Sequence, residues 1–153
     1  MHEIKESINI NATPAKVWSL LTDLPSWKTW NTFVINAETM EGGELKVGTC
    51  QVLTVATKPD AKPSVFNNEV SVLVPEKELV WVGKIPYFPR GFFEGIHWCT
   101  LEPLDGGTGC LFTQAEKMTG ALVPIIKLAS ISEDLRIGYK RMNRELKVAA
   151  ELL

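Results

Sequence analysis

The chain has 153 residues, of which 45% are hydrophobic and 22% charged, and its formal net charge at pH 7 is −2. These values are ordinary for a globular protein, and the length predicts a single domain over residues 1–153 with a substantial core. The near-neutral charge argues against a nucleic-acid partner. No apolar run approaches the ~20 residues of a membrane span, so no integral membrane association is expected.

The cysteines and histidines bear on disulfide formation and on metal binding. The three cysteines show no CxxC spacing, which predicts free, buried thiols and a reducing, cytoplasmic location. The histidines are His2 and His97, and no cluster of histidine, cysteine and carboxylate has the spacing of a metal site. No glycine-rich phosphate loop follows a predicted strand. The sequence therefore predicts neither a metal nor a cofactor.

The N-terminal 31 residues predict a strand followed by two short helices. Residues 2–11 alternate between apolar and polar side chains, as a half-buried strand does. Thr13 and Pro14 then form a helix start, an N-cap followed by proline at the first helical position. A second start signal of this type, Asp23 with Pro25, follows about ten residues later. Such short helices are unstable alone, so their three tryptophans, Trp18, Trp27 and Trp30, are expected to pack them against one end of a sheet.

The middle of the chain is rich in strands. Alternation and β-branched or aromatic residues predict strands over residues 33–38, 49–57, 66–74, 79–84, 92–102 and 109–118. An Asp105-Gly106 pair between the last two is a strong hairpin signal. No helix separates these strands. With the N-terminal strand they predict a seven-stranded antiparallel sheet.

From about Leu122 the hydrophobic period becomes helical. Apolar residues recur at three- and four-residue steps as far as Leu153, which predicts one amphipathic helix of roughly 28 residues, about 42 Å long. Gly138 lies on the apolar stripe, where glycine costs about 1 kcal/mol of helix propensity relative to alanine. Gly138 therefore either leaves room for a ligand or allows the helix to pack closely on a strand.

This order of elements is that of an α+β helix-grip fold, and several short motifs accompany it. They are Asn11-Ala12-Thr13-Pro14, Val17-Trp18, Leu21-Thr22-Asp23, Trp27, Trp30-Asn31, Gly48, Trp81, Gly95-Ile96-His97, Gly107-Thr108 and Glu116-Lys117-Met118-Thr119-Gly120. With these residues nearly the whole chain resembles the SRPBCC superfamily, also called START-like or Bet v 1-like, especially its polyketide cyclase/dehydratase-type members. The resemblance implies a curved sheet and a long helix that enclose a cavity, with the two short helices closing one end.

The resemblance also implies which strand faces line the cavity. Alternation leaves the 92–102 strand ambiguous, because both of its faces carry apolar residues. The family pattern turns the Gly-x-His phase inward, and with it His97. It also turns Glu116 inward, and Gln114 and Met118 share the phase of Glu116. Further along the sheet, Asn68 shares its phase with Val70, Val72 and Val74, and Trp81 shares its phase with Leu79 and Gly83.

His97 and Glu116 are the candidate catalytic pair. If they faced each other, each would shift the pKa of the other and the pair could transfer protons. Alternatively, Glu116 is satisfied by backbone amides or an arginine and His97 is structural. The residues expected to contact a ligand are Asn68, Trp81, Gln114 and Met118.

Two further segments are candidates for ligand contact. Residues 84–91 contain two prolines and carry Tyr87, Phe88 and Arg90, which predicts either a rim over the cavity mouth or an ordinary hairpin loop. Among the tryptophans, Trp30 is the one expected to touch a ligand, while Trp18 is expected to pack in the core.

Two functions compete for such a cavity. One is a cofactor-free enzyme of secondary metabolism, which folds a polyketide-like substrate into a reactive conformer and uses His97 and Glu116 for proton transfer. The other is a non-catalytic carrier of a lipid, quinone or similar ligand. In both cases the partner is a hydrophobic small molecule and the protein is a monomer or weak homodimer. An interaction module acting through its surface ranks last, because no large exposed apolar or single-sign face is evident.

Overall fold

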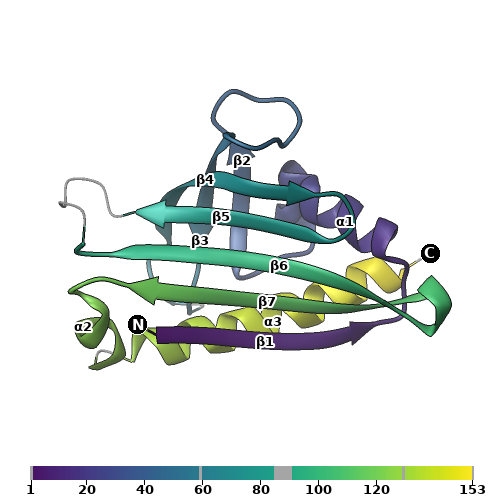
Figure 1. Cartoon of the computed structure of the whole chain (residues 1–153). Helices are drawn as coiled ribbons and strands as arrows, with labels where there is room; N and C mark the ends of the chain where they lie inside the picture. Colours follow the sequence, from purple (N-terminus) through teal and green to yellow (C-terminus); the bar gives the residue numbers. More distant parts are fainter. Residues whose placement is uncertain (1, 59, 85–90, 129, 153) are drawn as a thin grey trace.

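The fold, a computed structural model that describes residues 2–58, 60–84, 91–128 and 130–152, is built on one curved antiparallel sheet (Figure 1). Its seven strands are ordered β1-β7-β6-β5-β4-β3-β2. The strands are β1 (His2–Ile10), β2 (Val34–Thr39), β3 (Cys50–Val55), β4 (Ser64–Val74), β5 (Glu78–Lys84), β6 (Glu94–Leu104) and β7 (Gly109–Thr119). The meander from β2 to β7 confirms the predicted sheet, and β1 forms its other edge by pairing with β7.

The two predicted helices after β1 differ in kind. α1 (Pro14–Thr22) begins as expected, with the Thr13 side chain accepting a hydrogen bond from the Lys16 amide at 3.2 Å. The second element, η1 (Leu24–Thr29), is a 3₁₀ helix, and Asp23 makes no side-chain cap for it. Instead, the indole of Trp27 donates to the carbonyl of Leu20 at 3.1 Å. Tertiary packing, rather than a cap, therefore holds η1 in place.

The single C-terminal helix expected from the periodicity is divided in two. α2 (Val123–Leu128) precedes α3 (Ile131–Glu151), and Ser130 between them has a left-handed backbone with φ of 59°. A residue in this conformation cannot continue a right-handed helix, although the hydrophobic period runs through it. α3 lies across the inner side of the sheet and packs mainly on β1 (Figure 1). The result is a helix-grip fold.

Gly138 of α3 is a site of close packing, which decides between its two interpretations. A Cβ atom placed on Gly138 would overlap the ring of Phe33, just before β2. Glycine therefore lets the helix approach Phe33, and its cost in helix propensity has a packing reason.

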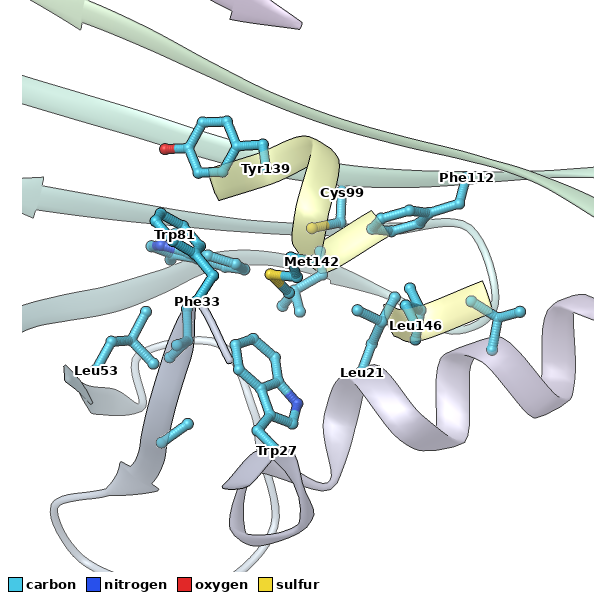
Figure 2. Packing of buried hydrophobic residues seen from close by; sticks show 14 of the residues in the cluster. Leu21, Trp27, Phe33, Leu53, Trp81, Cys99, Phe112, Tyr139, Met142 and Leu146 are labelled. Atoms are coloured by element: carbon cyan, nitrogen blue, oxygen red, sulfur yellow. The ribbon is translucent and has the colours of Figure 1, made fainter. Parts of the chain in front are cut away.

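The core lies between the sheet, α3, α1 and η1 (Figure 2). Trp27, Phe112, Leu21 and Leu146 are fully buried there, whereas Trp18, predicted to be the core tryptophan, is half-buried. Of the cysteines, Cys99 and Cys110 are buried and free, while Cys50 is free but exposed, contrary to expectation.

The phase predicted for β4 holds only for half of the strand. Asn68 and Val70 are buried as expected, but the register shifts at a bulge between Val70 and Val72. Beyond it, Leu73 rather than Val74 packs against the core. A bulge inserts one residue and so turns the following side chains to the opposite face, which alternation in a single strand does not reveal.

Candidate functional site

His97 lies on the inner face of β6 and is 6% exposed. It is paired in register with Trp81 of β5, and the two rings stack with centroids 4.2 Å apart and an interplanar angle of 6°. Tyr139 of α3 meets the imidazole edge-on at 5.1 Å. The sheet thus supplies a flat support on one side of His97 and the helix fixes the ring from another direction.

Burial determines the charge of this imidazole. Desolvation lowers the pKa of His97 from 6.5 to about 3, and a side-chain hydrogen bond with Gln114 opposes this shift only in part. His97 is therefore neutral at physiological pH. Its Nε2 atom is buried and has no hydrogen-bond partner among the residues that the structure describes. A buried polar atom in this state costs about 1–3 kcal/mol unless something else satisfies it.

A chain of amides supports His97 from the side of β1. Gln114 donates from Nε2 to Oδ1 of Asn143 at 2.8 Å, and Asn143 donates to the backbone carbonyl of Glu6 at 3.2 Å. Both amide side chains are almost fully buried, so their orientations are fixed by these bonds. Gln114 was predicted from the sequence, whereas Asn143 was not. The signal for Asn143 is a polar residue on the buried stripe of the C-terminal helix.

The half-buried Glu116 and the buried Tyr139 form a second polar pair. The hydroxyl of Tyr139 donates to Oε2 of Glu116 in a short hydrogen bond. Desolvation raises the pKa of the Glu116 carboxyl, and the bond from Tyr139 lowers it in part. Burial, and secondarily the neighbouring Glu116, raises the pKa of the Tyr139 phenol well above its usual value. Tyr139 was expected only as part of the helix's apolar stripe.

His97 and Glu116 share the inner face, and the sheet register makes them direct cross-strand neighbours. Their described hydrogen bonds nevertheless go to different partners, Gln114 for His97 and Tyr139 for Glu116. Burial, rather than mutual interaction, is the largest cause of both pKa shifts. Tyr139 connects the two groups, because its ring contacts the imidazole and its hydroxyl contacts the carboxylate.

The other predicted ligand contacts on the sheet are also buried on its inner side. Asn68 is 9% exposed, while Trp81 and Met118 belong to the hydrophobic core cluster. One residue of this face was missed. Gln51 of β3 is fully buried, and neither its amide nitrogen nor its amide oxygen has a partner in the described parts of the chain. Its signal was a glutamine alternating in phase with Leu53 and Val55 in an apolar strand.

Trp30 directly follows η1 and is distant in sequence from β6 and β7. Its ring is half-buried and packs on Trp27 with centroids 5.9 Å apart, and its buried Nε1 lacks a partner among the described residues. A ligand contact at Trp30 stays a prediction. The predicted rim residues Tyr87, Phe88 and Arg90 lie outside the described residues.

A groove of about 500 Å³ is found on the outer face of the sheet rather than under α3. Its lining includes Met40, Cys50, Asn67, Glu69, Val82 and Glu94. The odd-numbered residues of β4 in this lining alternate with the inward-facing Val70, whereas Asn68, one of the inner polar residues, also borders the groove. The enclosed cavity implied by the resemblance stays a prediction.

Residues 2–58, 60–84, 91–128 and 130–152 contain no group of three or more His, Cys, Asp or Glu side chains placed to hold a metal ion. Within these ranges, no helix combines the length and apolar character needed to cross a membrane.

Comparison with protein families decides the classification. The family model described as polyketide cyclase/dehydrase and lipid transport matches residues 1–151. The chain belongs to this family. Membership confirms the SRPBCC resemblance and supports a fold that binds hydrophobic ligands. The comparison with curated proteins found no match.

Solved structures agree on the fold at low sequence identity. A hypothetical protein from Helicobacter pylori superimposes with a TM-score of 0.78 at 18% identity, covering 98% of this chain and 88% of that one. A START superfamily protein from Mycobacterium smegmatis gives 0.71 at 13% identity, with 99% and 98% covered. The di-domain ARO/CYC protein BexL of the BE-7585A biosynthetic pathway gives 0.75 at 15% identity, covering 99% of this chain and 47% of BexL.

Proposed function

We propose that this polyketide cyclase/dehydrase and lipid transport family member binds a hydrophobic small molecule between the inner face of its sheet and α3, with His97 as a principal polar contact. The observation that carries the proposal is the unpartnered Nε2 of His97. Small-molecule sites are typically apolar, with a few polar groups held in fixed positions. His97 fits this description, because its surroundings include the rings of Trp81 and Tyr139.

The contacts around His97 favour a ligand-binding role over simple packing. Trp81, Tyr139 and Gln114 fix the orientation of the ring, so a ligand that bonds Nε2 need not order it first. The ring is also neutral, which favours an uncharged ligand group. A histidine needed only for its shape would gain nothing from a buried nitrogen without a partner.

A neutral fluorescent probe tests the proposal. N-phenyl-1-naphthylamine should bind the protein with increased fluorescence, and His97→Phe, which keeps an aromatic ring but removes both nitrogens, should weaken binding about 3- to 10-fold through loss of one hydrogen bond. Thr100→Val, on the opposite face of the same strand, is the matched control and should bind as the wild type does. Absence of probe binding, or equal binding by His97→Phe, would contradict the proposal.

A second candidate function is proton-transfer catalysis of the cyclase/dehydratase type, and the Glu116–Tyr139 pair favours it. A carboxyl group with a raised pKa exchanges protons nearer to neutral pH than an ordinary glutamate. In this function Glu116 is the catalytic acid or base. His97, whose depressed pKa makes it a weak base, orients the substrate by hydrogen bonding.

The base activity can be measured without knowing the substrate. With 5-nitrobenzisoxazole, removal of the C3 proton breaks the N–O bond and releases a coloured cyanonitrophenolate. Glu116→Gln should lower this rate 100-fold or more, and the wild-type rate should rise with pH through a midpoint above that of an ordinary glutamate. Glu94→Gln, near the outer groove, is the matched carboxylate control. An unchanged rate in Glu116→Gln would remove the catalytic role and leave the binding function standing.

A further inference from the structure

Two glycines on neighbouring strands are paired on the inner face of the sheet, two residues along the strand from the Trp81–His97 pair. Gly83 of β5 and Gly95 of β6 are directly paired in register. Trp81 and His97 are the neighbouring pair on the same face. A pair of glycines leaves the inner surface of two adjacent strands without side chains, so atoms from elsewhere can lie directly on the backbone.

Polar side chains fill this position from both sides. The amide oxygen of Asn68, from β4, lies so close to the position of a Cβ on Gly83 that the two would clash. From β7, Oε1 of Glu116 lies 2.8 Å from the place that a Cβ of Gly95 would occupy. The glycine pair therefore brings an amide and a carboxyl group from strands on opposite flanks toward each other over the sheet.

Gln51 extends this arrangement by one strand. It is paired in register with Asn68, is fully buried, and leaves both its donor and its acceptor without a partner in the described residues. Two unsatisfied polar atoms on one fully buried side chain are unusual in native proteins, because each costs about as much as a lost hydrogen bond. We call these three side chains the polar row: Asn68 and Glu116, which lie over the Gly83–Gly95 pair, and Gln51, which lies beside Asn68.

We infer that the polar row binds an uncharged, hydrogen-bonding oxygen group of the ligand, a hydroxyl or a carbonyl, and so selects neutral oxygenated molecules over carboxylates. This inference rests on the proposed binding function and names its ligand class. Gln51 offers both a donor and an acceptor, Asn68 an amide and Glu116 a carboxyl, which together match a group that donates and accepts.

The charges nearby disfavour an anion. The described residues of the polar row and of the adjacent Trp81–His97 pair include no lysine or arginine, whereas Glu116 is acidic. Arg141, one of the half-buried cations of α3, donates to the carbonyls of Thr32 and Ala56, beyond the end of β3 that is far from Gln51. A ligand carboxylate at the polar row would be desolvated beside another acid with no described counter-ion.

Three probes that share one ring system separate the contributions. Naphthalene, 2-naphthol and 2-naphthoate can each be titrated at pH 7 by quenching of tryptophan fluorescence. The hydroxyl probe should bind about 10-fold more tightly than naphthalene, corresponding to one or two net hydrogen bonds, and the carboxylate should bind most weakly. Tightest binding by 2-naphthoate, or equal binding of naphthol and naphthalene, would overturn the inference.

Variants assign the preference to the polar row. Gln51→Met keeps length and burial but removes the amide, so the preference for naphthol should fall to about twofold while naphthalene binds as before. Gly83→Ala should have a similar effect with Gln51 intact, because its methyl group displaces the Asn68 side chain. Thr54→Val, on the outer face of β3, is the control. A preference that survives both inner-face changes would overturn the inference, whereas failure of all three probes to bind would overturn the binding function itself.

Discussion

The two ends of the protein interior are built in opposite ways. At the end near α1, Leu21, Phe112 and Leu146 pack with essentially no exposed surface (Figure 2). Toward the other end, the inner face carries His97 and Gln51, whose buried polar atoms lack partners in the described chain. The first arrangement maximises stability, and the second gives up stability where a ligand would supply the missing bonds. Mutations at the two ends should therefore have opposite effects on stability.

The largest expected effect is at the apolar end. Phe112→Ala removes a fully buried ring and should lower the free energy of unfolding by about 3–5 kcal/mol, measured by urea denaturation. Ile137→Ala, at a half-exposed position of α3, is the control and should change it by no more than about 0.5 kcal/mol. A small loss in Phe112→Ala would mean that this end is not the stabilising core.

The next effect is a pH dependence that originates at His97. Its pKa is about 3 in the folded state and 6.5 in the reference state, so between these values the unfolded chain binds more protons and folding stability falls as pH falls. Between pH 7 and pH 5 this contributes a loss of about 2 kcal/mol.

The comparison that isolates His97 is between the wild type and His97→Phe. Both proteins contain the same carboxylates and so share their pH dependence, but only the wild type should show the additional loss at His97. Urea denaturation at pH 7 and pH 5 measures it. Identical losses in the two proteins would show that His97 is not held neutral by burial.

A smaller effect of opposite sign is expected at Gln51. Replacing it with methionine removes two unsatisfied polar atoms and retains apolar volume, so the ligand-free protein should gain about 1 kcal/mol. The change in melting temperature of Gln51→Met relative to wild type and Thr54→Val tests this. A destabilised Gln51→Met would indicate that the amide is already satisfied within the protein, and the contrast between the two ends would be lost.

The smallest effect concerns Glu116, which retains some solvent exposure and a bond from Tyr139. Because its pKa is raised on folding, the folded state binds more protons than the unfolded chain above the ordinary glutamate pKa. Stability should therefore decrease as pH rises through this window. Glu116→Gln, which resembles the protonated form, lacks this contribution, so its stability should rise more between pH 5 and pH 8 than that of the wild type in urea denaturation. A pH dependence identical to that of the wild type would argue against a perturbed carboxyl.

Local patterns in the sequence were sufficient for most of the fold. Alternation predicted all seven strands, Thr13-Pro14 predicted the start of α1, and Asp105-Gly106 predicted the β6–β7 hairpin. These signals succeed because strand alternation and helix capping depend on residues a few positions apart. The same reasoning extended the C-terminal helix through Ser130, because a left-handed residue leaves no mark on the hydrophobic period.

The candidate site likewise combines features that the sequence predicted with features that only the tertiary structure shows. The family resemblance predicted that His97, Gln114 and Glu116 face inward, and in the structure all three lie on the inner face of the sheet. Only the tertiary structure selected Tyr139 as the partner of Glu116, linked Gln114 to Asn143, and set Gln51 beside Asn68 at the glycine pair. These contacts join residues from different strands and from α3. They depend on sheet register and on how closely the helix approaches the sheet, and neither is encoded in the pattern of any single element.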